Sequence, residues 1–275
     1  MDELGERLTQ AWDDVLLGLD GCFSVDLRSL RGRVADREAD AAHYPASTIK
    51  LPVLMALLRE RAVGNPAALD DVLVHARFPS AAGGTFELQQ SYDQDDRTWA
   101  RLGTEVGLLD LADRMITVSS NIATDLIVER IGLETVRDYL DGLGLRDFRV
   151  ERLIGDSEAE AAGITNTVTA AGLATLMSAI ANGTDEDSAA ALDLLARQSH
   201  RGMIPAGLPD GVWSASKGGW VTGVKHDVAL VEPPDAPAYV LAVCTTSSLP
   251  DAEGMELVAH LSAVTWEQWS RWHAS

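Results

Sequence analysis

A serine and a lysine stand three residues apart at the head of an apolar run, in the stretch YPASTIKLPVL (residues 44–54). Ser47 suits a helix start, because short hydroxyl side chains cap free backbone N–H groups. Lys50 suits it badly, since the N-terminus is the positive end of the helix dipole and the following residues predict burial. Burial and the dipole both lower the pKa of a lysine amine. We therefore expect Lys50 to take a proton from Ser47; the alternative is an ordinary helix start with a solvated lysine.

Two further stretches supply the polar groups that an acyl-transferring serine needs: a proton donor to the leaving group and donors to the oxyanion. VSSN (118–121) places Ser119 and Asn121 between a helix end and a helix start. SASKGGW (214–220) places Lys217 near the end of a strand, followed by two glycines that let a backbone or ligand approach closely. Taken alone, the first stretch is also typical of a helix cap, and the second of a strand that ends in a turn.

Apolar periodicity predicts the elements that position these stretches. Helices are expected at 3–18, from Ser47 to about Arg61, and at 109–116, 122–131, 134–143, 170–182, 187–199 and 253–272. Strands are expected at 22–27, 32–38, 212–219, 226–233 and 239–246. Residues 62–105 are expected to be mostly loop with short helices. The strands at the two ends of the chain can pair only if the helical middle is inserted between them. We therefore expect an α+β fold with two domains. One is a five-stranded, mainly antiparallel sheet flanked by the terminal helices (1–45 and 205–275), and the other is an all-helical domain (46–204). The active site is expected at the seam between them.

Composition limits the partners of the protein. The 275 residues carry a formal net charge of −20, which repels nucleic acid and anionic membranes. Cys22 and Cys244 form neither a disulfide framework nor a zinc site, and YDQDD (92–96) is interpreted as a solvated acidic turn rather than a calcium loop. We expect no metal and no cofactor, a small-molecule substrate and, because no export signal or membrane span is visible, a cytoplasmic location. The oligomeric state stays open.

The three stretches, in this order, resemble the S-x-x-K, S-D-N and K-T-G motifs of class A β-lactamases and penicillin-binding proteins. The resemblance extends over nearly the whole chain, because KHDVALVEPP (225–234) and the terminal helices also look like that family. It implies a β-lactamase-like fold and a serine hydrolase that works through an acyl-enzyme on Ser47.

The resemblance also implies a role for each matching residue. Lys50 would be the base or proton shuttle of Ser47, Ser119 would pass a proton to the leaving group, and Asn121 would hold the amide side chain of the substrate. Lys217 would supply positive potential. The oxyanion would be bound by the backbone N–H groups of Ser47 and Trp220, with substrate bound along Gly218 and Gly219.

The chain departs from the family pattern at two motif positions. Ser120 replaces an aspartate that is mainly structural in the family. Gly218 replaces a hydroxyl residue that binds the substrate carboxylate, which removes a charge-assisted hydrogen bond of about 1.5–3 kcal/mol. Lys225 is a candidate to anchor the carboxylate instead.

The deacylation base is a further departure. The loop 151–167 lacks the family's E-x-x-x-N pattern, and Asp125 stands where the family has an asparagine that supports this loop. Asp156, Glu158 and Glu160 are candidate bases, although a solvated acidic loop fits them equally well. Without a placed base, the acyl-enzyme would form and persist.

Several functions stay open at this point. The chain is predicted to hydrolyse β-lactams or, as a D-alanyl peptidase or esterase, another ester or amide inside the cell. A glutaminase shares the S-x-x-K motif but departs in the other motifs. A binding protein that retains the fold without turnover is the alternative from a different class.

Overall fold

The computed structural model describes residues 3–274, which form two compact units. The first unit contains the chain up to Thr48, Val168–Thr184 and the chain from Leu195 onward. The second contains Ile49–Thr167 and Asp185–Leu194. Each unit therefore contains segments that are distant in the sequence.

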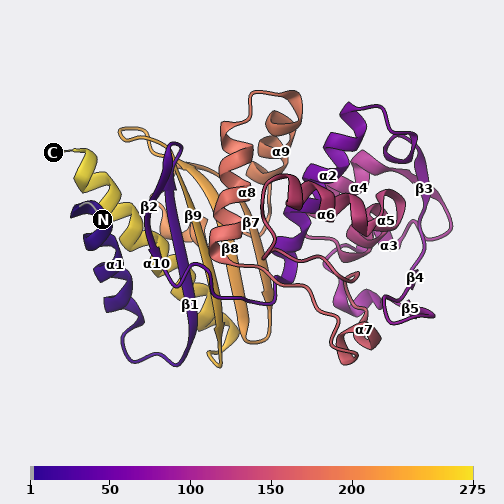
Figure 1. Cartoon of the computed structure of the whole chain (residues 1–275), viewed down its shortest axis with the longest axis horizontal. Coiled ribbons are helices and arrows are strands. Elements are labelled where there is room, and N and C mark those ends of the chain that lie inside the picture. The colour runs from indigo at the N-terminus through magenta and orange to yellow at the C-terminus, as the bar shows by residue number, and fades with distance from the viewer. Residues whose placement is uncertain (1–2, 275) are drawn as a thin grey trace. The chain divides into compact units, whose positions relative to one another are not determined.

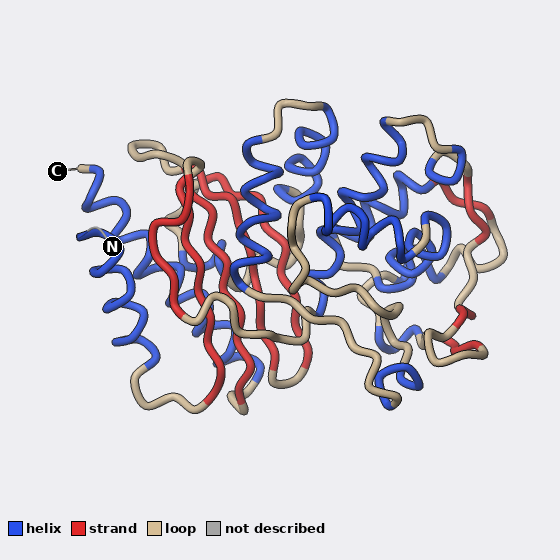
Figure 2. The backbone as a smooth tube through the Cα atoms, viewed as in Figure 1, coloured by secondary structure: helices blue, strands red, loops and turns tan. Residues whose placement is uncertain are grey.

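The first unit is built on an antiparallel sheet, which has five strands within the described residues (Figures 1 and 2). The strands are β1 (Gly21–Ser29), β2 (Gly32–Arg37), β7 (Trp213–Val221), β8 (Val224–Glu232) and β9 (Tyr239–Ser247). Their order is β2-β1-β9-β8-β7, so the pairing of β1 with β9 joins the two ends of the chain. This confirms the predicted sheet and the α+β class.

Helices cover both faces of this sheet (Figure 1). α1 (Glu3–Leu16) and α10 (Asp251–His273) pack together on one face, where Phe23, Val25 and Leu27 of β1 join their apolar side chains in the core. α8 (Ala170–Asn182) packs on β1, β8 and β9 from the other side. Successive strand residues alternate between these two helical layers.

The second unit is mainly helical. Its elements are α2 (Lys50–Ala62), η2 (Pro66–Ala68), β3 (Asp71–Leu73), β4 (Arg77–Pro79), β5 (Thr85–Glu87), η3 (Gln90–Tyr92), α3 (Asp96–Trp99), β6 (Glu105–Gly107), α4 (Leu108–Thr117), α5 (Asn121–Ile131), α6 (Leu133–Gly142) and α7 (Ser157–Ala161). The 3-10 turn η1 (Ala46–Ile49) and helix α9 (Glu186–Ala196) cross the limits between the units, and η4 (Ile204–Gly207) belongs to the first. α2 contacts α4, α5 and α6, and every residue from Lys50 to Leu58 is buried.

Three details differ from the sequence-based expectations. Residues 168–184 and 195–204 group with the sheet rather than with the helical unit, because α8 buries its apolar side chains on the strands. The segment 62–105, expected to be mostly loop, forms two short antiparallel strand pairs, β3–β6 and β4–β5. Strand β6 begins at the end of this segment and continues to Gly107. The α-helix begins at Lys50, after a 3-10 turn that contains Ser47.

Among the described residues, no helix combines the length and apolar character that a membrane span requires.

Candidate active site

The predicted site residues are distributed over both units, and each group is described within its own unit. The second unit contains Lys50, the VSSN motif and the loop 151–167. The first contains Ser47 and the SASKGGW motif.

The side chain of Lys50 is fully buried and makes polar contacts with the VSSN motif. Its ammonium donates to Asn121 Oδ1 at 2.7 Å and to the backbone oxygen of Ser119 at 2.9 Å. Ser119 Oγ lies 3.3 Å from Lys50 Nζ. The fold of this unit thus brings the S-x-x-K lysine to the serine and the asparagine of the second motif.

Burial lowers the pKa of Lys50 to about 7. The charges of Asp93 and Asp125 act in the opposite direction and limit the decrease. A large fraction of Lys50 is therefore neutral near pH 7, which is the state that can accept a proton.

Ser119 has a strained backbone and precedes a capped helix. Its φ is +63°, a left-handed conformation that non-glycine residues seldom adopt and that often occurs at functional sites. Ser120 then caps α5 by accepting a hydrogen bond from Ala123 N at 3.3 Å. The hydroxyl of Ser120 also bonds to the carboxylate of Asp95, so a carboxylate from another segment supports this motif.

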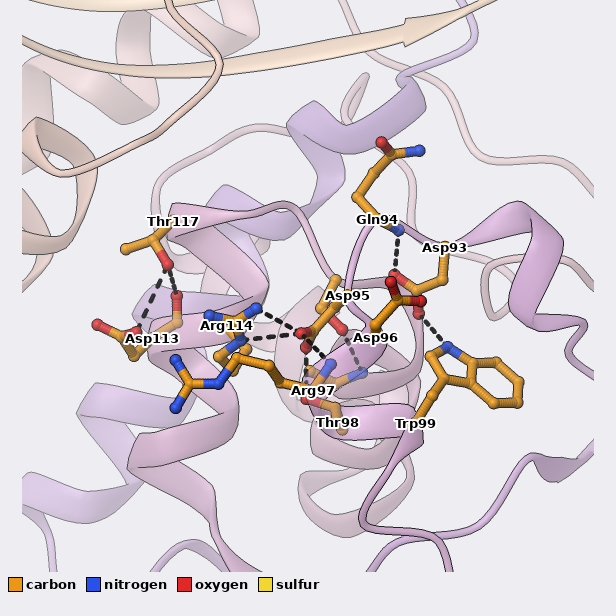
Figure 3. A network of polar contacts seen from close by, with 12 residues as sticks. Asp93, Gln94, Asp95, Asp96, Arg97, Thr98, Trp99, Asp113, Arg114 and Thr117 are labelled. Carbon is orange, nitrogen blue, oxygen red and sulfur yellow. Dashed lines mark hydrogen bonds and ion pairs between the residues drawn. The ribbon is translucent and has the colours of Figure 1, made fainter.

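Asp95 is buried in a polar network (Figure 3). Arg114 Nε donates to Asp95 Oδ1 at 3.0 Å, and Thr98 Oγ1 donates to Asp95 Oδ2. Burial raises the pKa of Asp95, but the hydrogen bonds from Arg114 and Thr98 and the charge of Arg114 outweigh it and lower the pKa below its usual value. Asp95 is therefore an ionised, buried support for the loop that carries Ser119.

Asp93 anchors the start of α5. Its two carboxylate oxygens accept from Asn121 N at 2.9 Å and Ile122 N at 2.8 Å, and the indole of Trp99 donates to it at 2.9 Å (Figure 3). The interpretation of YDQDD as a solvated acidic turn is wrong for Asp93 and Asp95.

In the first unit, the backbone around Ser47 lies against strand β7. Ser47 belongs to η1, and Ala46 just before it has a φ of +46°. A Cβ atom placed on Gly219 would lie 2.7 Å from Ser47 N and 2.8 Å from Thr48 N. Only a glycine at position 219 lets β7 approach the serine so closely, which explains the glycine of the third motif.

Lys217 and Trp220 lie on β7, the edge strand of the sheet. Gln198 Oε1 accepts from Lys217 Nζ and from Gly218 N, each at 3.1 Å. The N–H of Gly218 thus points away from β8, and because alternate residues of a strand point the same way, the N–H of Trp220 does too. The indole of Trp220 packs against the His200 ring at a centroid distance of 4.7 Å. Gln198 was missed in the sequence, where nothing distinguishes it from other glutamines.

Lys225, the residue predicted as a candidate carboxylate anchor, has contacts with other groups of the first unit. Its ammonium donates to Val221 O at 2.7 Å and to Asp251 Oδ1, at the start of α10, at 2.8 Å. Lys225 pairs with Trp220 in the sheet, whereas Lys217 pairs with Val228, so the two lysines point to opposite faces. Lys225 therefore ties β8 to α10.

The loop 151–167 is fixed at its base and, further along, at Ile154. Asn166 closes the base by accepting from the backbone N–H groups of Glu151 at 2.7 Å and Arg152 at 3.0 Å. Asp125 Oδ1 accepts from Ile154 N at 2.9 Å, which attaches the loop to α5. Burial raises the pKa of Asp125 well above its usual value, and the hydrogen bond from Ile154 N opposes this only in part.

The acidic residues of this loop have structural partners or face solvent. Asp156 is buried, and its oxygens accept from Ser80 Oγ at 2.9 Å, Ala81 N at 2.8 Å and Ala159 N at 3.1 Å. Glu158 is exposed on α7, and Glu160 pairs with Arg152 at 3.1 Å. Asp156 thus caps α7 and fixes the loop, and this does not support its predicted role as the deacylation base.

Comparison with known proteins places the chain in a family. The model of the β-lactamase enzyme family matches residues 11–269. The β-lactamase AST-1 of Nocardia asteroides is 30% identical over 85% of this chain and 73% of its own length, and a β-lactamase of Bacillus licheniformis is 27% identical over the same shares.

Solved structures share the fold. PBP-A superposes with a TM-score of 0.81 at 23% identity, covering 97% of this chain and 96% of PBP-A. A β-lactamase from Sphaerobacter thermophilus superposes with a TM-score of 0.81 at 23% identity, covering 97% of each chain. A PBP-A variant was solved as an acyl-enzyme with penicillin G, with a TM-score of 0.80 at 24% identity over 97% of each chain. The chain is thus a member of the β-lactamase enzyme family, a serine hydrolase with the class A β-lactamase-like fold.

Proposed function

We propose that Ser47 is the nucleophile and is acylated by β-lactams. Lys50, three residues further along the chain, takes the proton of the serine. Its buried position and its pKa of about 7 support this role, since a protonated lysine could not act as a base. Ser119, whose hydroxyl lies 3.3 Å from Lys50 Nζ, carries the proton on to the leaving nitrogen.

The remaining groups bind the substrate and the developing negative charge. The N–H groups of Ser47 and Trp220 are assigned to the oxyanion, and the outward direction of the N–H at position 220 supports this. Asn121 is assigned to the amide side chain of the substrate. Lys217 supplies positive potential beside the edge of β7. All of this requires protein groups and substrate alone.

We propose further that deacylation is the slow step. Water must be activated to hydrolyse the ester on Ser47, and the acidic residues of the loop 151–167 have structural partners or face solvent, so we assign none of them as the base. Asp156 is engaged by three donors, and Asp125 accepts the backbone N–H of Ile154. Ile154, the residue that Asp125 fixes to α5, has an apolar side chain. A PBP-A variant that forms an acyl-enzyme with penicillin G supports the same chemistry on this fold.

The observation that carries the proposal is the contact of the buried Lys50 ammonium with both Ser119 and Asn121. An intact-mass time course with penicillin G and with a cephalosporin tests it. We expect an adduct with the mass of the whole β-lactam that outlasts the free drug by minutes or longer. Ser47→Ala should form none.

The other outcomes decide between the alternatives. An adduct that decays within seconds would contradict slow deacylation and indicate an efficient β-lactamase. A wild-type protein that forms no adduct with either drug would contradict β-lactams as acyl donors. Labelling by a fluorophosphonate that persists in Ser47→Ala would overturn the assignment of the nucleophile.

A further inference from the structure

The segment that carries Ser47 has a strained backbone whose conformation must be held from outside. Ala46 has a φ of +46°, and a left-handed conformation costs a non-glycine residue on the order of 1 kcal/mol. Such a conformation persists only where its surroundings enforce it. Thr48 bonds back to Pro45 O through its N–H at 3.1 Å and its hydroxyl at 2.6 Å, which closes the turn around Ala46.

One contact that reaches this turn from the sheet comes from His226 on β8. Its Nε2 lies 2.9 Å from Tyr44 O, two residues before Ala46. Its Nδ1 lies 3.0 Å from Thr245 N and must accept that backbone proton. The ring hydrogen is therefore on Nε2, and His226 donates to the carbonyl of Tyr44.

His226 is placed for this task by the register of the sheet. It pairs directly with Gly219, whose missing side chain admits the backbone of Ser47. Two residues at the same level of β7 and β8 thus define where the serine backbone can lie: Gly219 by allowing its approach and His226 by holding the carbonyl of Tyr44.

The surroundings keep His226 neutral. Burial lowers its pKa to about 4, and the neighbouring charges of His43 and Lys225 act in the same direction, while hydrogen bonds with Tyr44 and with the backbone of Lys225 oppose them. His43 packs edge-on against it at 5.3 Å, and burial lowers the pKa of His43 to about 4 as well. The thiol of Cys244 faces His226 from β9 and remains protonated because burial raises its pKa.

We propose that His226 is a positioning residue for acylation. By donating to Tyr44 O it keeps Ala46 left-handed and directs the N–H of Ser47 toward the oxyanion. The ring nitrogens of His226 contact the backbone atoms Tyr44 O and Thr245 N, so we infer that it acts through the backbone. The link to acylation rests on the function proposed above, whereas the effect on the backbone does not.

Two substitutions separate the two hydrogen bonds of the ring. The amide of Gln reaches the position of Nε2, so His226→Gln keeps a donor for Tyr44 O and loses the acceptor for Thr245 N. The amide of Asn reaches the position of Nδ1, so His226→Asn keeps the acceptor and loses the donor. Thr246→Val is a matched control, because it removes the hydroxyl 2.8 Å from His43 Nδ1 in the same polar layer without affecting Tyr44.

Hydrogen exchange of a peptide that covers residues 44–48 is measured first, with exchange in the rest of the chain as reference. We expect at least tenfold faster exchange in His226→Asn only, with protection retained in His226→Gln and Thr246→Val. Acylation of Ser47 by penicillin G should fall about 10–100-fold in His226→Asn and less than threefold in the other two. Because His226 stays neutral, the pH dependence of acylation between pH 5.5 and 9 should keep its midpoint in all variants.

Unchanged exchange and acylation in His226→Asn would overturn the positioning role, as would equal losses in the Asn and Gln variants. If the wild type forms no acyl-enzyme, the function proposed above fails. The exchange comparison then still decides whether His226 holds the turn.

Discussion

The carboxylate of Asp125 accepts a hydrogen bond from the backbone of Ile154 at 2.9 Å, so the loop residue that is fixed to α5 carries an apolar side chain. Asp125 lies one helical turn after Asn121 on α5, and its charge acts on Lys50. A polar side chain at position 154 would therefore lie near the proposed base and its partners.

Ile154→Glu should accelerate deacylation, because it places a carboxylate that can activate water at this point of the loop. We expect the lifetime of the penicillin G adduct to shorten at least tenfold, measured by intact mass after free drug is removed. Ile154→Gln is the matched control and should leave the lifetime within threefold of wild type. Equal lifetimes in the Glu and Gln variants would mean that position 154 does not face the acyl group.

Acylation should depend on pH through Lys50. The neutral amine is the active form and its pKa is about 7, so the rate should rise about tenfold for each pH unit below 7 and level off above it. Stopped-flow measurement of adduct formation from pH 5.5 to 9 gives the profile. Lys50→Ala should lower the plateau by about 10²–10⁴, and Lys50→Arg, which stays protonated, should lose as much. A rate that falls as pH rises through 7 would require the protonated amine instead.

The structure also shows which parts of the molecule a sequence can predict. The positions of helices and strands can be predicted from apolar periodicity. The pairing of β1 with β9 can be predicted because the strands at the two ends of the chain form one sheet once the helical middle is inserted between them. The side of the sheet on which Lys225 lies cannot be predicted in this way. It depends on the hairpin register that pairs Lys225 with Trp220, and a shift of one residue would move the side chain to the other side. The support of Ser120 by Asp95 joins residues 25 positions apart, and no local pattern encodes such a contact.

Loss of Asp95 should destabilise the second unit. Its carboxylate is buried and receives hydrogen bonds from Arg114, Thr98 and Ser120, so Asp95→Ala leaves a guanidinium without its buried partner. Breaking a buried ion pair in this way costs about 3–5 kcal/mol. Asp96→Ala, at an exposed neighbour, is the control and should change the free energy of unfolding by less than about 0.5 kcal/mol. Similar midpoints of urea unfolding for the two variants would show that Asp95 contributes little.

Asp227 should make the stability of the protein depend on pH. It is fully buried opposite Gly218, with Oδ2 accepting from Ile204 N at 3.0 Å and no hydrogen-bond partner for Oδ1 among the described residues. Burial raises its pKa to about 7, while the Ile204 N–H and the charge of Lys217 oppose this. The folded state therefore binds a proton that the unfolded state releases near pH 3.8.

The sign of the effect follows from that difference. Between pH 4 and 7 the folded state binds more protons, so the free energy of unfolding should fall by about 1.4 kcal/mol per pH unit and then stay constant above pH 7. Asp227→Asn cannot titrate, so its stability relative to wild type should rise by about 2–3 kcal/mol between pH 5 and pH 8. Asp235→Asn, at an exposed position, should follow the wild type. If the difference in the free energy of unfolding between Asp227→Asn and wild type, measured by urea unfolding, is the same at pH 5 and pH 8, Asp227 is ionised throughout and its charge is compensated by Lys217.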